Sequence, residues 1–338
     1  MTTVADVGEH ALLARLLPRL PRKSPSVLVG PGDDAAVLAP GRNERLVVTT
    51  DAVVEGVHFS CAYSSPADVG HKALAVNLSD LAAMAATPRW ALLSLVLPGS
   101  WLVTDVENLV DGLAALAQRH GVAVVGGNIT RTDGPLVVDV TAGGEVRPRR
   151  WLTRAGAKAG HAIYVSGTIG GAAAGLEMLR DVSPVPGSRL PAPGCAARHR
   201  RPEPRVRLGV AIGRARAASA AMDLSDGLAD ALRQVAAASG IGVRIDGDAL
   251  PIDPGAREWW EARGIDPVSA AVKGGDDYEL LFAVPPKSGG ALRSVARHVT
   301  EPRLTKIGVF TKDPRALVIE RAGTEDALPE GFEHFAHR

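Results

Sequence analysis

The chain has 338 residues, of which 46% are hydrophobic, and a formal net charge of +1 at pH 7. This length suits two domains, and the hydrophobic fraction suits a packed core rather than a disordered chain. The balanced charge excludes the basic surface that is typical of nucleic-acid-binding proteins. The two cysteines, Cys61 and Cys195, stand in unlike contexts and form no metal-spacing motif, so we expect a reduced, cytoplasmic protein.

We expect neither export nor a membrane partner. Residues 1–10 carry acids and have no apolar core, unlike a signal peptide. The longest apolar stretch, 91–103, is interrupted by Pro98 and Gly99 and is too short to span a bilayer.

Helices and strands alternate along the first half of the chain. Hydrophobic periodicity predicts helices at 8–20, 69–86 and 105–120. Apolar runs predict strands at 26–29, 46–50, 90–97, 122–125 and 135–146. Pro88 is expected to end the second helix, and Gly121 the third.

A change of composition at 147–160, which is basic and glycine-bearing, indicates a domain boundary near residue 149. We therefore expect domains at 1–148 and 149–338. The second domain repeats the α/β pattern, with strands at 162–165, 218–222, 242–245, 278–284 and 305–310 and helices ending at 180 and spanning 227–238. The segment 184–207 is rich in proline and arginine, which predicts a long surface loop.

Aspartates cluster in glycine turns and at strand ends. The motifs are Gly32-Asp33-Asp34, Thr49-Thr50-Asp51, Asn77-Leu78-Ser79-Asp80, Asp223-Leu224-Ser225-Asp226-Gly227 and Gly275-Asp276-Asp277. Two carboxylates ~4 Å apart repel by roughly 4 kcal/mol at an effective dielectric constant of ~20. Oxygen-rich acidic sites bind hard divalent ions such as Mg²⁺, and such sites often serve phosphorylated substrates.

Each motif also has a purely structural explanation. Gly30–Asp34 suits a tight turn; Asp80 suits a helix N-cap or a surface acid; and the Asp223–Gly227 motif suits a helix cap. Thr49 and Asp51 point to the same side of a strand, and Thr50 offers its hydroxyl or carbonyl oxygen nearby. Three oxygen donors in three residues favour a metal site at this strand end.

Two glycine-bearing loops suit phosphate binding or a hinge. Gly126-Gly127-Asn128 follows a predicted strand, and 166–171 precedes a predicted helix, where backbone N–H groups can approach an anion. Neither loop is a P-loop, because the G-x-x-x-x-G-K-[ST] pattern is absent from the sequence. The H-E-x-x-H and G-x-S-x-G patterns are absent as well, which argues against zinc and acyl-enzyme chemistry.

Taken together, the motifs resemble those of the thiamine-monophosphate kinase family, within the aminoimidazole-ribonucleotide synthetase superfamily. The resemblance runs from about residue 6 to the C-terminus, and its most specific parts are Thr49-Thr50-Asp51, Glu55-Gly56-Val57-His58-Phe59 and Gly274-Gly275-Asp276-Asp277-Tyr278-Glu279-Leu280. It implies a two-domain α/β protein that phosphorylates thiamine monophosphate with ATP and several Mg²⁺ ions, the last step of thiamine diphosphate biosynthesis. It also implies an N-terminal mixed sheet-helix domain that binds metal and ATP and dimerises. The C-terminal α/β domain would complete the phosphate and substrate site.

The resemblance assigns site residues by position. The metal shell would comprise Asp34, Thr49, Thr50, Asp51, Asp80, Asn128, Asp223 and Asp226, with Asp33 as an alternative to Asp34. ATP would contact Gly127, Asn128, Arg154 and Ser225. Thiamine monophosphate would contact His58, Asp276 and Phe332.

Four positions depart from the family pattern. Asp276 stands where glutamate is common, so its side chain is one methylene shorter. Phe332 replaces a common tryptophan, Val110 an aromatic residue and Gly171 an aspartate. These differences concern affinity rather than the reaction.

The implied mechanism is direct transfer, because the sequence offers no placed nucleophile and the acceptor phosphate carries its own negative oxygens. Three other functions remain as alternatives. A synthetase of the superfamily would turn over formylglycinamidine ribonucleotide, a nucleotide or metal sensor would bind Mg-ATP without consuming it, and a metal phosphohydrolase would release phosphate without an acceptor.

Overall fold

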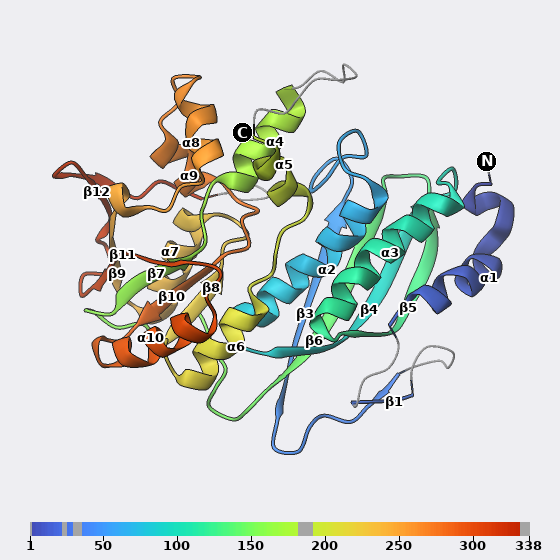
Figure 1. Ribbon diagram of the computed structural model, residues 1–338, viewed down its shortest axis with the longest axis horizontal. Helices are drawn as coiled ribbons and strands as arrows, with labels where there is room; N and C mark the ends of the chain where they lie inside the picture. Colours follow the sequence, from blue (N-terminus) through green and yellow to red (C-terminus); the bar gives the residue numbers. More distant parts are fainter. Residues whose placement is uncertain (1, 22–25, 30–35, 182–191, 332–338) are drawn as a thin grey trace. The chain divides into compact units, whose positions relative to one another are not determined.

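The computed structural model describes residues 2–21, 26–29, 36–181 and 192–331 (Figure 1). Helices and strands are mixed throughout, which confirms the α/β class predicted from the sequence. The chain forms two compact units, residues 1–81 with 86–149 and residues 82–85 with 150–338, and each is described by itself. Within the described ranges, no helix is both long enough and apolar enough to cross a membrane.

The first unit contains a four-stranded sheet in the order β3-β6-β4-β5. Its strands are β3 (Arg45–Val54), β4 (Thr87–Pro98), β5 (Ala123–Thr132) and β6 (Val137–Val146). β4 runs parallel to β5, whereas β6 is antiparallel to both β3 and β4. Two short strands, β1 (Val27–Val29) and β2 (Val37–Leu38), pair separately.

Three helices belong to the same unit: α1 (Val4–Leu16), α2 (Pro66–Ala83) and α3 (Val103–His120). Figure 1 shows α2 and α3 side by side against the sheet. Their backbones touch, since a Cβ on Gly70 would lie 1.8 Å from Leu109 O and one on Gly112 2.1 Å from Ala67 O. Only glycine permits this approach at either position, so the crossing fixes where α2 lies.

The second unit is built on a seven-stranded sheet in the order β13-β12-β9-β11-β7-β10-β8. The strands are β7 (Ala162–Ser166), β8 (Ala220–Asp223), β9 (Gly242–Asp246), β10 (Leu280–Val284), β11 (Leu304–Thr311), β12 (Leu317–Arg321) and β13 (Thr324–Ala327). β9 and β12 run parallel, and the other neighbours are antiparallel.

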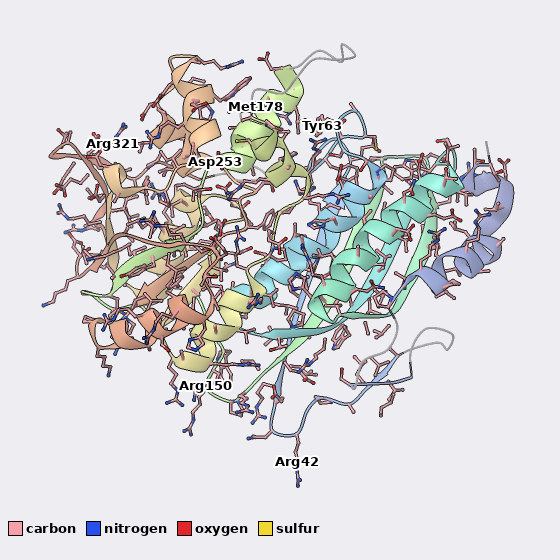
Figure 2. The ribbon with its side chains drawn as sticks, in the orientation of Figure 1. Arg42, Tyr63, Arg150, Met178, Asp253 and Arg321 are labelled. Atoms are coloured by element: carbon pink, nitrogen blue, oxygen red, sulfur yellow. The ribbon has the colours of Figure 1, made fainter. Side chains whose placement is uncertain are left out.

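The helices of the second unit are α4 (Gly171–Asp181), α5 (Pro193–Arg200), α6 (Val206–Ala215), α7 (Leu228–Ser239), α8 (Pro254–Glu261), α9 (Pro267–Lys273) and α10 (Gly289–His298). An apolar core joins α4, α5, α7, α8 and α9 to the sheet, and it includes Met178 of α4, which is labelled in Figure 2. Because β7, β8 and β10 are adjacent, the loops at their shared end lie close together.

The strand expected at 122–125 proves much longer than predicted. β5 continues to Thr132, so Gly126-Gly127-Asn128 lies inside a strand and not in a loop after it. The pairing of β4 with β5 shifts between Ala91 and Leu92, next to these glycines. The prediction of a loop or hinge at this position is therefore wrong, whereas contact of these glycines with a phosphate stays a prediction.

The predicted surface loop at 184–207 is also wrong for its described part. Residues 193–200 form α5, and Arg205 immediately precedes α6. Arg198 and Arg205 both donate to Glu279, which is fully buried. These two arginines, which look solvent-exposed in the sequence, therefore pair with an acid that lies 81 and 74 positions further along the chain.

Candidate functional site

The strongest contact among the predicted site residues of the first unit joins β3 to α2. Thr49 Oγ1 donates to Asp80 Oδ2 at 2.5 Å. Asp51 lies two residues further along β3 and therefore points to the same face of the sheet. Asp80 is in the last turns of α2, far from its N-terminus at Pro66, so the N-cap explanation of this residue is wrong.

A buried amide next to Asp80 has an unsatisfied oxygen. Asn77 is fully buried on α2 and donates from Nδ2 to Ala73 O at 3.0 Å, but its Oδ1 accepts no hydrogen bond. A buried acceptor without a donor is costly unless a cation or an ordered water satisfies it. The contacting pair Thr49 and Asp80, with Asp51 on the same face of β3, presents hard oxygen donors of the kind that suit Mg²⁺.

Thr50 and Asn128 lie elsewhere on the sheet. The Thr50 hydroxyl contacts Thr141 Oγ1 at 3.1 Å and Asp139 Oδ1 at 3.3 Å, on the face opposite to Asp80. Asn128 is in β5, three strand spacings of ~4.8 Å from β3. A single ion in one chain thus cannot bind both Asn128 and Thr49, and Thr50 can join the Asp80 side only through its carbonyl oxygen.

His58 is held by its own backbone turn. Its Nδ1 accepts a hydrogen bond from Val54 N at 3.1 Å, and its carbonyl oxygen accepts one from Lys72 Nζ at 2.9 Å. An Nδ1 acceptor leaves the proton of a neutral imidazole on Nε2. This hydrogen bond fixes the tautomer and the orientation of the His58 ring.

In the second unit, the Asp223–Gly227 motif forms the loop between β8 and α7. Gly227 is the N-cap of α7, with a φ of 95°, and no side chain caps the helix. The helix-cap explanation of Asp223, Ser225 and Asp226 is therefore wrong, and their side chains are not committed to that role. Asp223 is the last residue of β8 and is buried.

The loop that carries Asp276 is hydrogen-bonded to this motif. Asp276 N donates to Ser225 O at 2.7 Å, and Tyr278 N donates to Leu224 O at 3.0 Å. A Cβ on Gly275 would lie 2.6 Å from Ser225 O, so the two backbones pack directly on each other. The structure thus brings together Ser225 and Asp226, predicted for ATP and metal, and Asp276, predicted for the thiamine substrate.

The loop at 166–171, predicted as a phosphate site, already binds a carboxyl group of the protein itself. Asp277 accepts hydrogen bonds from Gly170 N at 2.6 Å and from Ala172 N at 3.1 Å, at the start of α4. These donors are occupied, so the prediction of a phosphate there is wrong. Burial raises the pKa of the Asp277 carboxyl from 3.8 to about 7, although Arg198 and the two N–H groups oppose the rise.

Arg154 lies beside the same region of the second unit. Its guanidinium donates to Gln234 Oε1 on α7, and Gln234 donates in turn to Asp230 in the first turn of that helix. Arg154 is exposed. The exposed guanidinium is thereby oriented along α7, which begins directly after the Asp226 loop.

Two of the predicted residues, Asp34 and Phe332, lie outside the described residues, as does Asp33. Among the residues that are described, no three His, Cys, Asp or Glu side chains gather closely enough to bind a metal by themselves. The eight-residue metal shell, which draws on both units, therefore stays a prediction. Sequence reasoning missed the arginines and the histidine of α5 and the role of Glu279, although Glu279 lies inside a recognised motif.

Two family models of known proteins match this chain, one in each half of the sequence. Residues 32–146 match the family model AIR synthase related protein, N-terminal domain, and residues 158–320 match AIR synthase related protein, C-terminal domain. These matches and the fold place the chain in the AIR synthase related class of proteins.

Individual relatives narrow this assignment. The chain is 40% identical over 336 residues to thiamine-monophosphate kinase of Escherichia coli (strain K12), covering 97% of this chain and 98% of that protein. It is similar to the crystal structure of thiamine-monophosphate kinase from Stenotrophomonas maltophilia K279a (TM-score 0.79, 39% identity, 93% and 95% covered). It is also similar to AaThiL complexed with AMPPCP and TMP (TM-score 0.76, 31% identity, 99% of each chain covered). The chain belongs to the thiamine-monophosphate kinase family.

Proposed function

We infer that the protein is an ATP-dependent thiamine-phosphate kinase, which transfers the γ-phosphoryl group of ATP to thiamine monophosphate. The products are ADP and thiamine diphosphate, in the last step of thiamine diphosphate biosynthesis. Identity of 40% over almost the full length of a thiamine-monophosphate kinase supports this function. So does the likeness to a structure that holds an ATP analogue and TMP.

The observation in this chain that carries the proposal is the pair of hydrogen bonds between two loops. Asp276 N and Tyr278 N donate to Ser225 O and Leu224 O. Groups predicted for the phosphates and for the thiamine moiety therefore belong to neighbouring loops, as transfer between two bound substrates requires.

Phosphoryl transfer to a phosphate acceptor requires the side chains mainly to position the two substrates. The acceptor is a phosphate that is largely ionised at neutral pH, so no strong general base is needed. No residue is assigned as a catalytic acid, base or nucleophile. Direct in-line transfer follows, with the protein holding donor and acceptor in reach of each other.

We propose Mg²⁺ as the required metal, bound by the oxygen donors Asp34, Thr49, Asp51, Asp80, Asn128, Asp223 and Asp226 and by the Thr50 carbonyl oxygen. The separation of Asn128 from Thr49 means that these donors serve several ions. Bound Mg²⁺ supplies neutralisation of the phosphate charges. Without bound metal, hydrogen bonds partly offset the repulsion between the acidic side chains. The hydrogen bond from Thr49 to the Asp80 carboxylate is an example.

The remaining site residues fall into two groups under this proposal. Gly127, Asn128, Arg154 and Ser225 contact ATP, and the exposed Arg154 guanidinium suits an anionic phosphate. His58, Asp276 and Phe332 contact thiamine monophosphate. The cationic thiazolium ring is attracted by a carboxylate and by an aromatic face, which suits Asp276 and Phe332.

We further propose that the protein is a homodimer through its N-terminal sheet. The face of this sheet that points away from α2 and α3 displays apolar side chains on β3 and β4. Leu46 is 51% exposed, Val48 56% and Leu92 36%. β3 is also an edge strand, and exposed apolar side chains beside such an edge favour a protein partner. The free cysteines and the use of ATP support a cytoplasmic location.

The function is tested by following the label from γ-³²P-ATP in the presence of Mg²⁺ and thiamine monophosphate. Label in thiamine diphosphate, with none in inorganic phosphate, is the expected result. Label only in inorganic phosphate would identify a phosphohydrolase instead. Enzyme incubated with labelled ATP alone, then denatured and washed, should keep no label, because the transfer is direct.

A further inference from the structure

The Asp276 loop has a backbone that amino acids with side chains rarely adopt. Asp276 has a φ of 66° and Tyr278 a φ of 50°, both in the left-handed region. Two such residues within three persist only where the surroundings hold them. Strain of this kind points to a side chain whose direction matters, and it raises the question of what holds Asp276.

The Asp276 carboxylate is contacted on both of its oxygens. Tyr278 Oη donates to Oδ1 at 3.2 Å, and His199 Nδ1 lies 3.3 Å from Oδ2. His199 is only 2% exposed, whereas the Asp276 side chain is 27% exposed. The carboxylate is thus contacted by His199 and Tyr278, and the part of it that remains exposed is accessible to a ligand. The 3.3 Å approach of His199 Nδ1 to the carboxylate is an ion-pair distance and does not have the geometry of a hydrogen bond, so His199 acts on Asp276 through close packing and, when its ring is protonated, through charge.

His199 can hold Asp276 only if helix α5, which carries it, is itself fixed. Arg205, directly before α6, donates to Glu279 through Nε at 2.7 Å and through Nη2. Arg198 of α5 donates to Glu279 Oε1 at 3.2 Å, and Ser166 Oγ donates to Oε2 at 2.6 Å. Glu279 is fully buried and needs these partners, so the ion pairs tie α5 to the end of the Asp276 loop.

Arg198 also binds the start of α4. Its guanidinium donates to Thr168 Oγ1 and to Thr168 O, both at 2.6 Å, and lies 3.8 Å from Asp277. A Cβ on Gly171 would lie 2.9 Å from Arg198 Cδ, so the absence of a side chain there makes room for the arginine.

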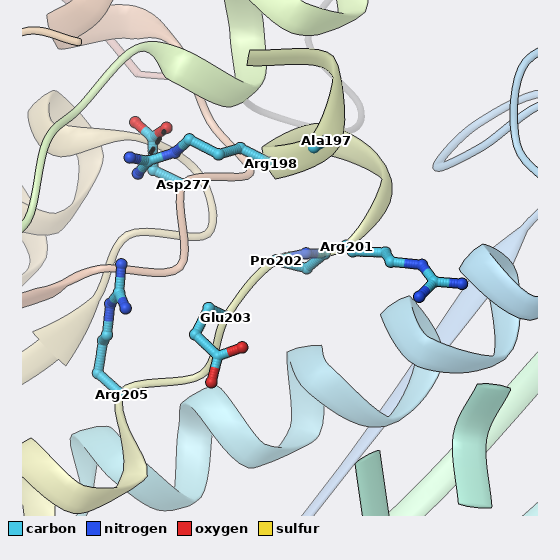
Figure 3. A pocket seen from close by; sticks show the side chains of 7 residues that line it. All are labelled: Ala197, Arg198, Arg201, Pro202, Glu203, Arg205 and Asp277. Carbon is cyan, nitrogen blue, oxygen red and sulfur yellow. Dashed lines mark ion pairs between the residues drawn. The ribbon is translucent and has the colours of Figure 1, made fainter. Parts of the chain in front are cut away.

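Figure 3 shows the Arg198 guanidinium beside Asp277, with Arg205 on the same wall of a cavity of about 190 Å³. These arginines are committed to protein acids and leave this wall without a free cation. The residues that line this cavity therefore stabilise the Asp276 loop, and we do not propose that the cavity binds a ligand.

We propose that His199 and Tyr278 are positioning residues that orient the Asp276 carboxylate toward the thiamine moiety, with Arg198, Arg205 and Glu279 fixing the helix that carries His199. The inference rests on the proposed function, since it assigns Asp276 to the thiamine substrate. It explains why a histidine is buried against a partly exposed acid. It also gives the basic segment around α5 a role in substrate affinity.

The first experiment compares His199→Leu with His199→Asn. The two replacements branch at the same position, but only asparagine keeps a donor near the position of Nδ1. His199→Leu removes the polar contact at 3.3 Å from Asp276 Oδ2, so it should raise the KM for thiamine monophosphate by up to about tenfold and leave the KM for ATP within about twofold. His199→Asn should recover most of the loss.

Tyr278→Phe tests the same carboxylate from its other oxygen and leaves no cavity, so it remains informative if His199→Leu fails to fold. We expect the same selective rise in KM. His161→Leu is the matched control, because His161 is also a buried histidine of this unit, bonded to Ser219 at the opposite end of β8. It should leave the ratio of the two KM values unchanged.

A double-mutant cycle separates positioning from a merely structural role. In an Asp276→Ala background, His199→Leu and Tyr278→Phe should each have no further effect on the KM for thiamine monophosphate. Equal increases in both KM values, or full additivity with Asp276→Ala, would overturn the inference while the kinase activity stands. A wild-type protein that releases no ADP in response to thiamine monophosphate would overturn the proposed function, and the inference with it.

Discussion

A methyl group added at Gly127 should be far more damaging than one added at Gly126. Gly127 lies in β5 opposite Leu93 of β4, and a Cβ there would lie 1.9 Å from Leu93 O. At Gly126 the nearest atom to such a Cβ is Leu92 Cδ2 at 3.1 Å, the end of a flexible side chain. The two adjacent glycines therefore form a matched pair, in which only Gly127 is held by a close backbone approach.

The magnitude follows from these two distances. A carbon–oxygen contact needs ~3.3 Å, so Gly127→Ala overlaps a main-chain atom by more than ~1 Å. β4 cannot yield easily, because it is paired to β5 on one side and to β6 on the other. Overpacking typically costs ~1–3 kcal/mol, and this rigid case should cost about 3 kcal/mol or more. Gly126→Ala should stay within ~1 kcal/mol of the parent, since a stiffer unfolded chain offsets the small clash.

Urea unfolding of the two variants measures the difference directly. If Gly127 were needed only for close approach of ATP, Gly127→Ala would unfold at the same urea concentration as Gly126→Ala and show only a higher KM for ATP. That result would refute the packing argument. A large loss of stability in Gly127→Ala alone would mean that glycine is required at this position for the packing of β5 against β4.

Three further predictions concern the metal, the dimer and pH. Asp51→Asn should lose most Mg²⁺-dependent activity and remain folded, whereas Asp133→Asn, at a 94% exposed side chain, should behave like the parent in the same assay. Light scattering at micromolar concentration should give a dimer, which Leu46→Asp weakens and Val57→Asp does not; a monomeric parent would contradict the proposed interface. Without metal, the free energy of unfolding should fall as the pH rises from about 4 to about 7, because folded Asp277 keeps a proton that the unfolded chain has lost. Asp277 contributes up to ~1.4 kcal/mol per pH unit to this slope, and Asp277→Asn should flatten it.

Elements with strong periodicity were predictable from the sequence. The helix expected at 105–120 is α3, Val103–His120, and Gly121 ends it in a left-handed conformation as predicted. The strand expected at 162–165 is β7, Ala162–Ser166. In both cases the local pattern and the packing favour the same structure, so local reasoning was sufficient.

Elements defined by distant partners were not predictable in this way. The chain around α5 is rich in arginine and proline and looks solvated, yet Arg198 and Arg205 bind Glu279 in the core. Likewise, Gly126-Gly127-Asn128 looks like a loop, because glycine is rare inside strands. Its glycines are explained by the neighbouring strand, which no local pattern contains.

The sequence predicted which residues form the candidate site better than it predicted how their side chains contact one another. The residues expected to bind metal include the contacting pair Thr49 and Asp80. The sequence did not predict that Asp277 would satisfy the start of α4, nor that His199 would contact Asp276. Such contacts depend on where the loops meet in space.

The most direct test of the proposed kinase is the rate of ADP release, measured by a coupled assay in the presence of Mg²⁺ with and without thiamine monophosphate. We expect release to depend on thiamine monophosphate and to match the thiamine diphosphate formed mole for mole. ADP release at the same rate without thiamine monophosphate, or none with it, would contradict the assignment.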